Sequence, residues 1–241
     1  MRGVSQTVDT LVIVAEQRGG KQRIPRPASY LLGGPPPWAA LPPDRRRFTL
    51  AEIRARLAEL PPPADAVPRV DGSRAAAVLV PLYEAEGDTV VVLIKRPETM
   101  PSHRGEIAFP GGKLEPDVDR SLRDTALREA HEEIGLDPAT VEIVRRLDGI
   151  GTVASRFMIT PFVGFLAGRP ELRPDPREVV RVLEVPLSEL LDPAWYREEH
   201  WEVAPNFAGG VQFYELADET IWGATARILT SFLGHLARGR G

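Results

Sequence analysis

The sequence predicts an α/β domain, and three observations support this fold class. Two apolar runs, residues 75–83 and 89–94, lie on either side of a polar turn and are typical of a strand hairpin. Apolar residues at helical spacing, from Leu122 to Ile134, predict an amphipathic helix. Further strand-like runs follow, and a second helical pattern closes the chain. We therefore expect helices packed on a mixed sheet.

Residues 1–73 are expected to form an arm and linker, and residues 74–238 the main domain. The arm contains a strand candidate at residues 8–14, followed by stretches rich in glycine and proline that cannot hold regular structure. A capping-box spacing then predicts a short amphipathic helix over residues 50–60, which three prolines stop. We expect this arm to be loosely packed.

The main domain continues with four more strand candidates and the closing helix. The strand candidates are apolar or β-branched runs bounded by turn residues, namely residues 141–147, 158–165, 179–185 and 211–216. The closing helix covers residues 220–237, where apolar residues recur on one side. No internal repeat is visible, and a chain of 241 residues does not require a second large domain.

The composition is that of an ordinary soluble protein, with 43% hydrophobic and 27% charged residues. A formal net charge of −4 argues against a general nucleic-acid binder, which would show a basic stripe. The absence of cysteine excludes a disulfide, a thiolate zinc site and a thiol nucleophile. The early apolar run is too short for a membrane span or a signal-peptide core. We expect a cytoplasmic protein that binds neither nucleic acid nor membrane.

The predicted helix after residue 122 carries an unusual group of acids. Glu129, Glu132 and Glu133 are three and four residues apart, so their carboxylates lie on one side of the helix and repel one another. They also lie in its last turns, where the negative end of the helix dipole disfavours acids. Mg²⁺ and Mn²⁺ prefer such oxygen ligands and would turn the group into a metal site. Taken alone, the pattern also fits a solvated helix face.

A glycine turn precedes this helix. The segment Phe109-Pro110-Gly111-Gly112 permits positive φ and close approach of the backbone to a ligand. Together with the stretch Arg128-Glu129-Ala130-His131-Glu132-Glu133-Ile134-Gly135-Leu136, it resembles the signature of the Nudix hydrolases. The Arg-Glu pair, the Glu-Glu pair and the following glycine all stand at matching positions.

The loop between the turn and the helix departs from the common family pattern. Fifteen residues lie between Gly112 and Arg128, two more than is usual, and Arg120 stands where the pattern has a glutamate. Asp119 is the candidate substitute for that glutamate. A loop of this length is similar to the one in the coenzyme A diphosphatase branch of the family.

A second motif of that branch precedes the glycine turn. The positions that fit it are Arg96, Met100, His103, Gly105, Ile107 and Phe109. Pro101 stands where the branch usually has Arg, and Glu106 where it usually has Gln. Residues 159–165, 213–215 and 221–226 also look like the C-terminal half of this branch. The resemblance runs from about residue 74 to residue 237, and it implies an α/β/α sandwich with a mixed sheet.

The resemblance also implies roles for individual residues. Arg128 is expected to orient Glu129 by a charge-assisted hydrogen bond, with Asp124 as its alternative partner. Glu178 is expected to act as general base from a facing loop; Glu132 is the competing base, and the alternative for Glu178 is a plain exposed turn residue. The catalytic candidates are Arg128, Glu129, Glu132 and Glu178, and the metal candidates are Glu129, Glu132, Glu133 and Gly112. The substrate-binding candidates are Arg96, His103, Gly105, Phe109 and Gly111.

These features predict a diphosphatase that depends on Mg²⁺ or Mn²⁺, because cations stabilise the charge that develops when water attacks phosphorus. The branch resemblance implies cleavage of coenzyme A or an acyl-CoA into 3′,5′-ADP and 4′-phosphopantetheine or its acyl form, and it implies a homodimer. Two alternatives stay open. One is hydrolysis of another nucleoside diphosphate derivative, such as ADP-ribose, a dinucleotide or a nucleoside triphosphate; the other is a nucleotide-binding module without turnover.

Overall fold

The larger of two sheets forms the centre of the molecule. The structure, a computed structural model, describes residues 19–66, 71–100, 103–152, 155–201 and 210–240. In this part of the chain, eight strands form the larger sheet. They are β2 (Arg74–Ala85), β3 (Asp88–Lys95), β4 (Ile107–Ala108), β5 (Gly111–Lys113), β6 (Val141–Arg146), β7 (Ile150–Gly151), β8 (Phe157–Leu166) and β9 (Arg181–Pro186).

The sheet is mixed, because β2 pairs parallel to β8 while its other neighbours run antiparallel. The longer strands lie in the order β3–β2–β8–β6, and β9 extends the sheet beyond β3. Strand β5 pairs with the beginning of β2, where Gly111 lies opposite Val78 and Gly112 opposite Ala77. This pairing fixes the glycine turn at one end of the sheet.

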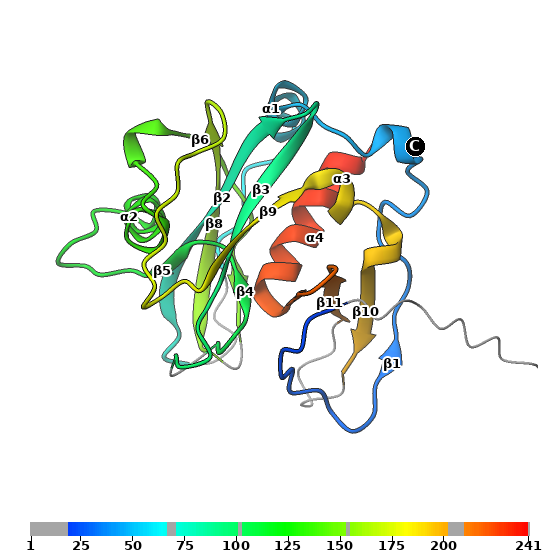
Figure 1. The fold of residues 1–241 in the computed structure, drawn as a ribbon, viewed down its shortest axis with the longest axis horizontal. Coiled ribbons are helices and arrows are strands. Elements are labelled where there is room, and N and C mark those ends of the chain that lie inside the picture. The colour runs from blue at the N-terminus through cyan, green and yellow to red at the C-terminus, as the bar shows by residue number, and fades with distance from the viewer. Residues whose placement is uncertain (1–18, 67–70, 101–102, 153–154, 202–209, 241) are drawn as a thin grey trace, which may run out of the picture.

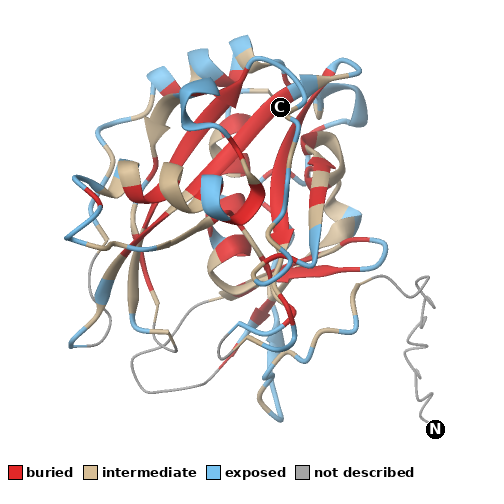
Figure 2. Cartoon of the chain, turned by 60° about the vertical axis from the view of Figure 1, so that its left-hand side comes forward, coloured by how far each residue is buried: buried red, intermediate tan, exposed pale blue. Residues whose placement is uncertain are grey.

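Helices cover both faces of this sheet (Figure 1). Helix α2 (Leu122–Ile134) packs on one face, and α1 (Leu50–Ala58) and α4 (Gly223–Ala237) pack on the other. Side chains of β3 alternate accordingly, since Val92 and Ile94 face α2 whereas Val91 and Leu93 face α4. The strands between the helices are the most deeply buried part of the molecule (Figure 2). The predicted α/β/α sandwich with a mixed sheet is confirmed.

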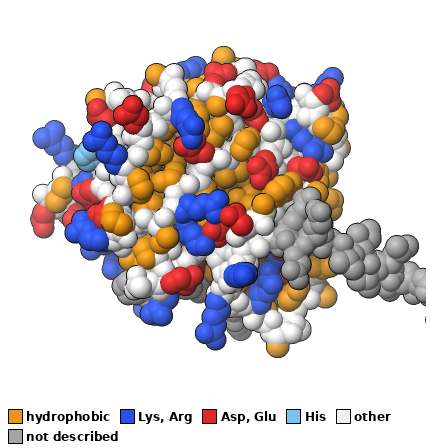
Figure 3. Space-filling model, viewed as in Figure 1, with side chains coloured by type: hydrophobic (Ala, Val, Ile, Leu, Met, Phe, Trp, Pro, Cys, Tyr) orange, Lys and Arg blue, Asp and Glu red, His pale blue; other side chains and the backbone are white. Residues whose placement is uncertain are grey.

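A second, antiparallel sheet lies beside α4. Its strands are β1 (Leu31–Leu32), β10 (Tyr196–His200), β11 (Gly210–Glu215) and β12 (Thr220–Trp222), in that order. The remaining elements are α3 (Leu187–Leu190) and the 3₁₀ turns η1 (Pro43–Arg45), η2 (Pro138–Thr140) and η3 (Pro193–Trp195). On the face shown in Figure 3, positive and negative side chains are interspersed.

Most predicted elements agree with the structure, and the clearest error concerns the closing helix. That helix was expected from residue 220, but Thr220–Trp222 pair with β11 as a strand and the helix begins at Gly223. The reason is the backbone at Trp222, whose φ of −148° and ψ of −178° are extended. Helix α1 ends at Ala58 rather than at residue 60, because the prolines after Leu60 disfavour helical backbone. The strand expected at residues 8–14 lies outside the described residues.

The expectation of a loosely packed N-terminal arm is wrong. Trp38, Phe48, Ile53 and Leu57 are all buried in the same core as the sheet and α4. The expected capping box of α1 is present, with the Thr49 and Glu52 side chains each bonded to the other's backbone N–H. The sequence did not indicate what the apolar side chains of the arm pack against, because α4 lies more than 160 residues later in the chain. The division between residues 73 and 74 stays a prediction.

The linker after α1 is also held in place. Arg146 Nη2 donates to the carbonyl of Pro63 at 2.7 Å, and the N–H of Gly149 donates to the carbonyl of Ala64 at 3.0 Å. These bonds fasten the linker along β6 and the turn that follows it. Within the described residues, no helix has the length and apolar character needed to cross a membrane.

The buried arm yields a stability prediction. Trp38 is 1% exposed and stacks on Tyr214 with ring centroids 6.3 Å apart. We expect Trp38→Ala to lower the free energy of unfolding by about 3–5 kcal/mol, because it leaves a cavity in the main core. The control is Leu32→Ala in the same arm, where a side chain 71% exposed should change stability by less than about 0.5 kcal/mol. Equal effects of the two variants in denaturant unfolding would show that the arm is not part of the core.

Candidate active site

The acidic helix α2 has well-defined ends that fix its charged side chains. The Ser121 hydroxyl accepts a hydrogen bond from the N–H of Asp124 and caps the first turn. Gly135 ends the helix with a φ of +67°, a left-handed conformation that glycine adopts without strain. Ala126, Ala130 and Ile134 are fully buried against the sheet. The side of the helix that carries Glu129, Glu132 and Glu133 therefore lies beside this buried face and next to β5.

Arg128 holds three carboxylates at once. Its Nε and Nη2 donate to the two oxygens of Asp119 at 2.8 and 3.0 Å. Nη2 also donates to Glu129 at 2.9 Å, and Nη1 donates to Glu132 at 2.8 Å. These bonds, with Asp119 first, hold the pKa of Arg128 above its ordinary value. The predicted hydrogen bond from Arg128 to Glu129 is thus observed, and among the described residues Arg128 forms its ion pairs with Asp119, Glu129 and Glu132 rather than with Asp124.

Asp119, the candidate substitute for the missing glutamate, is paired with Arg128. Its side chain is 2% exposed and also accepts hydrogen bonds from the Thr125 hydroxyl and from the N–H of Glu115, both at 2.9 Å. The guanidinium of Arg128 and these two donors lower the pKa of Asp119 to about 2. The longer loop therefore supplies a carboxylate to Arg128 from position 119, one residue before the position at which the common pattern has its glutamate.

Glu133 is the most deeply buried of the acids, at 1% exposure. One of its oxygens accepts the N–H of Gly111 at 2.9 Å, and the other accepts Arg96 Nη1 at 3.1 Å. Burial raises the pKa of Glu133 to about 8 despite these two donors. Burial likewise raises the pKa of Glu129, and Glu132 and Glu178 add to the rise. The cluster is therefore short of positive charge.

The two glycines before the helix allow β5 to approach α2. A Cβ on Gly112 would collide with the carboxylate of Glu129, and one on Gly111 would collide with the backbone of β2. The φ of Gly111, +153°, is also unfavourable for other residues. Glycine at position 111 is thus required for the approach that brings Glu133 onto the Gly111 N–H, whereas at position 112 it lets the Glu129 carboxylate lie against the backbone.

The loop before β9 faces the acids. The N–H groups of Arg173 and Asp175 donate to the carbonyls of Ile134 and Glu133 at 2.8 and 2.9 Å, which ties the loop to the end of α2. Glu178 follows in this loop, with its N–H bonded to the Asp175 carbonyl at 3.0 Å. Its negative charge contributes to the raised pKa values of Glu129 and Glu133, after burial. The structure thus brings Glu178 to the acidic cluster.

The upstream motif is only partly assembled at this site. Arg96 joins the cluster through Glu133, a link that no local pattern indicates because the two residues are 37 positions apart. His103 instead pairs with Glu106, with 2.7 Å between Nδ1 and the carboxylate. Gly105 has a φ of +62°, and a Cβ there would collide with Glu98. No contact joins His103 or Gly105 to the acids, so their substrate roles stay predictions.

Phe109 does not present its ring at the site. It is 3% exposed and packs in the core on the α4 side of the sheet. It supports the glycine turn from within, because β4 and β5 lie immediately before and after it. A direct contact between its ring and a ligand would require the core to open. Pro101 lies outside the described residues.

The donor set suits a hard divalent cation. Carboxylate oxygens are the ligands that Mg²⁺ and Mn²⁺ prefer, and the missing side chain at Gly112 lets the Glu129 carboxylate lie close to the backbone there. In the described residues, however, no three His, Asp or Glu side chains are placed as a ready metal site. Arg128 donates to one oxygen of Glu129 and to one of Glu132, and Arg96 donates to one oxygen of Glu133. A cation that binds the Glu133 oxygen held by Arg96 would have to displace that ion pair.

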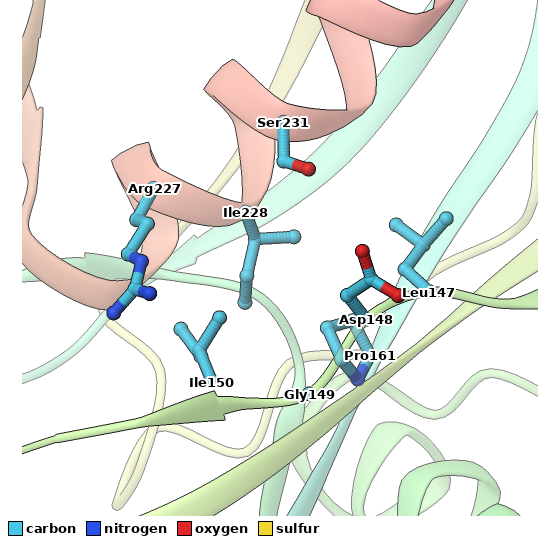
Figure 4. A pocket seen from close by; sticks show the side chains of 8 residues that line it. All are labelled: Leu147, Asp148, Gly149, Ile150, Pro161, Arg227, Ile228 and Ser231. Atoms are coloured by element: carbon cyan, nitrogen blue, oxygen red, sulfur yellow. The ribbon is translucent and has the colours of Figure 1, made fainter. Parts of the chain in front are cut away.

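A separate cavity of about 170 Å³ lies on the opposite side of the sheet, against α4 (Figure 4). Arg227, Ile228 and Ser231 of α4 line one wall. The other wall is formed by Leu147, Asp148, Gly149, Ile150 and Pro161. It contains none of the predicted site residues.

The buried pair of Asp119 and Arg128 yields a pH-dependent prediction. Because the pKa of Asp119 falls from 3.8 to about 2 on folding, its carboxylate stabilises the fold above pH 4, and this contribution is lost as the pH falls towards 2. We expect Asp119→Asn to cost about 2 kcal/mol at pH 7 and progressively less below pH 4. Denaturant unfolding at several pH values measures this, with the exposed Asp117→Asn as control. A cost that is the same at pH 7 and pH 2.5 would rule out the ion pair as its cause.

The chain is similar in sequence to known proteins. A family model described as the NUDIX domain matches residues 73–207, more than half of the chain. A protein of Photorhabdus laumondii named uncharacterized Nudix hydrolase NudL is 36% identical over 172 residues, covering 71% of this chain and 88% of that protein. Nudix hydrolase 22, chloroplastic, of Arabidopsis thaliana is 39% identical over 163 residues, which cover 64% of this chain and about half, 52%, of the plant protein.

Solved structures show a more distant likeness. A MutT/nudix family protein from Enterococcus faecalis is 17% identical, with a TM-score of 0.44, and the match covers 78% of this chain and 69% of that one. The family model spans the acidic helix, the glycine turn and the sheet that holds them together. The chain therefore belongs to the Nudix hydrolase family.

Proposed function

We propose that this chain is a Mg²⁺- or Mn²⁺-dependent diphosphatase that cleaves coenzyme A or an acyl-CoA into 3′,5′-ADP and 4′-phosphopantetheine or its acyl form. The observation that carries the proposal is the carboxylate group held by Arg128 and Arg96 beside the glycine turn. The preference for coenzyme A rests on the second motif, above all on Arg96. The proposal includes a cytoplasmic homodimer that acts on a small nucleotide and binds neither nucleic acid nor membrane.

Each residue of the site has a separate role in the proposed reaction. Glu129, Glu132 and Glu133 would hold the cation, with the backbone of Gly112 close by. When bound, the cation supplies positive charge next to the diphosphate oxygens and acidifies the attacking water. Arg128 keeps Glu129 and Glu132 in fixed orientations, so little reorganisation is required when charge develops on phosphorus. Arg96 supplies a guanidinium on the same side as Glu133.

Glu178 is the proposed general base. It lies on a loop tied to the end of α2, and it is not held by Arg128. Glu132, the competing candidate, has a 53% exposed side chain and gives one oxygen to Arg128 Nη1. We therefore place the general base at Glu178, whose carboxylate is not engaged by Arg128.

Another nucleoside diphosphate derivative is the alternative substrate. The observation that favours it is Glu106, which stands where the branch has Gln and forms an ion-pair contact with His103. This contact occupies Nδ1 of the histidine that was expected to bind substrate phosphate. A pocket built for a different leaving group would tolerate such a change.

A substrate panel tests the proposal. We expect release of 3′,5′-ADP from CoA and acetyl-CoA, identified by mass, with Mg²⁺ or Mn²⁺ present and not with EDTA. ADP-ribose, NADH and dGTP should be cleaved far more slowly. If CoA is untouched while one of these is cleaved, the proposed substrate is wrong and the diphosphatase chemistry stands. If nothing is cleaved under any condition, the chain is a nucleotide-binding module.

The acid cluster is tested by removing charge without changing shape. We expect Glu132→Gln and Glu133→Gln each to lower turnover by about a hundredfold or more, because each removes negative charge that holds the cation in the transition state. Glu142→Gln, on the exposed surface of β6, is the matched control and should keep normal turnover. Near-normal rates for both site variants at saturating Mg²⁺ would refute the metal assignment.

A further inference from the structure

Arg96 lies where it can contact both the protein and a bound anion. It follows β3 directly, and its side chain points to the α2 face of the sheet, as its contact with Glu133 shows. Its backbone N–H is fixed by the carbonyl of Glu106 at 3.0 Å. The side chain is 18% exposed, so the guanidinium is mostly buried and still reachable from solvent.

The guanidinium of Arg96 is only partly satisfied by the protein. Nη1 donates to Glu133 at 3.1 Å, while Nε is buried and has no hydrogen-bond partner among the described residues. A buried donor without a partner costs free energy, and that cost is recovered when an acceptor arrives. A phosphate oxygen is such an acceptor, because phosphate matches the forked geometry of a guanidinium.

Glu133, on the other side of this pair, has no oxygen free of a donor. One oxygen accepts from the N–H of Gly111 and the other from Arg96. A divalent cation that binds Glu133 therefore competes with a guanidinium already in place, and the two positive charges repel each other at short range. Metal binding at Glu133 is disfavoured as long as Arg96 stays there.

We propose that Arg96 changes partner during the binding cycle, from Glu133 to the diphosphate of the substrate. In the free protein Arg96 acts as a substitute counter-ion for Glu133. When a diphosphate draws the guanidinium away, the oxygen of Glu133 becomes available to the cation. Cation and diphosphate then each strengthen the binding of the other, as reciprocal linkage requires. This inference rests on the proposed metal-dependent function.

The first test measures binding of Mn²⁺ alone by calorimetry, with chelator-treated full-length protein. We expect Arg96→Met to bind Mn²⁺ at least about fivefold more tightly than the unmodified chain, because the competing guanidinium is gone. Arg123→Met, an exposed arginine on α2, removes the same charge elsewhere and should leave the affinity unchanged within about twofold. Mn²⁺ affinity of Arg96→Met that is equal to or weaker than that of the unmodified chain would overturn the inference.

A double-mutant cycle tests whether the effect passes through Glu133. In a Glu133→Gln background, Arg96→Met should no longer tighten Mn²⁺ binding, because there is no carboxylate for the two cations to share. Thermal unfolding of each variant shows that the compared proteins are folded. A gain that persists in the Glu133→Gln background would mean that Arg96 acts only through its general charge, which overturns the proposed exchange.

The second test uses α,β-methylene-ADP, a diphosphate that is not hydrolysed at this bond. In the unmodified chain it should tighten Mn²⁺ binding, after correction for Mn²⁺ held by free nucleotide, and Arg96→Met should reduce this factor by at least about fivefold. An unchanged factor would overturn the inference while leaving the proposed enzyme intact. If neither protein binds Mn²⁺ at millimolar concentration, the metal-dependent function itself fails, and the inference with it.

Discussion

The guanidinium of Arg128 is the contact on which the candidate site depends. Three carboxylates, from Asp119, Glu129 and Glu132, meet at its nitrogens, and without it they would repel one another at close range. The loop before α2 is folded around the same contact, because Asp119 reaches Arg128 only when the segment from Glu115 closes back on itself. Loop, helix end and acid cluster are therefore one electrostatic unit.

The sheet determines where that unit lies. Parallel pairing of β2 with β8 builds a rigid centre, and β5 adds to the beginning of β2 so that the glycine turn meets α2. Gly111 then donates its N–H to Glu133, so a residue of strand β5 also forms part of the site. Because Trp38 and Ile53 of the N-terminal segment complete the core behind the sheet, that segment supports the active-site face indirectly.

The sequence revealed those features whose causes are local. The acidic helix and its end at Gly135 follow from residues within one or two turns, and the hairpin of β2 and β3 follows from two apolar runs around a short polar turn. Burial of Trp38 was missed because its partners come from the far end of the chain. Strand β10 was missed because its sequence, Tyr-Arg-Glu-Glu-His, is polar, and it is a strand only by pairing with β1 and β11. The pair of Arg96 and Glu133 depends on the assembled sheet and could not be read from either motif.

The balance of charge at the candidate site favours a bound cation. Asp119, Glu129, Glu132, Glu133 and Glu178 outnumber Arg96 and Arg128, the two arginines that form ion pairs within this cluster, and burial already raises the pKa of Glu129 and Glu133. A polyanion entering this cluster would meet net negative charge at close range, which low local dielectric makes more costly. Added positive charge relieves both the internal repulsion and the repulsion of the substrate. The proposed cation and diphosphate would therefore each reduce the repulsion that the other meets at this surplus of carboxylate.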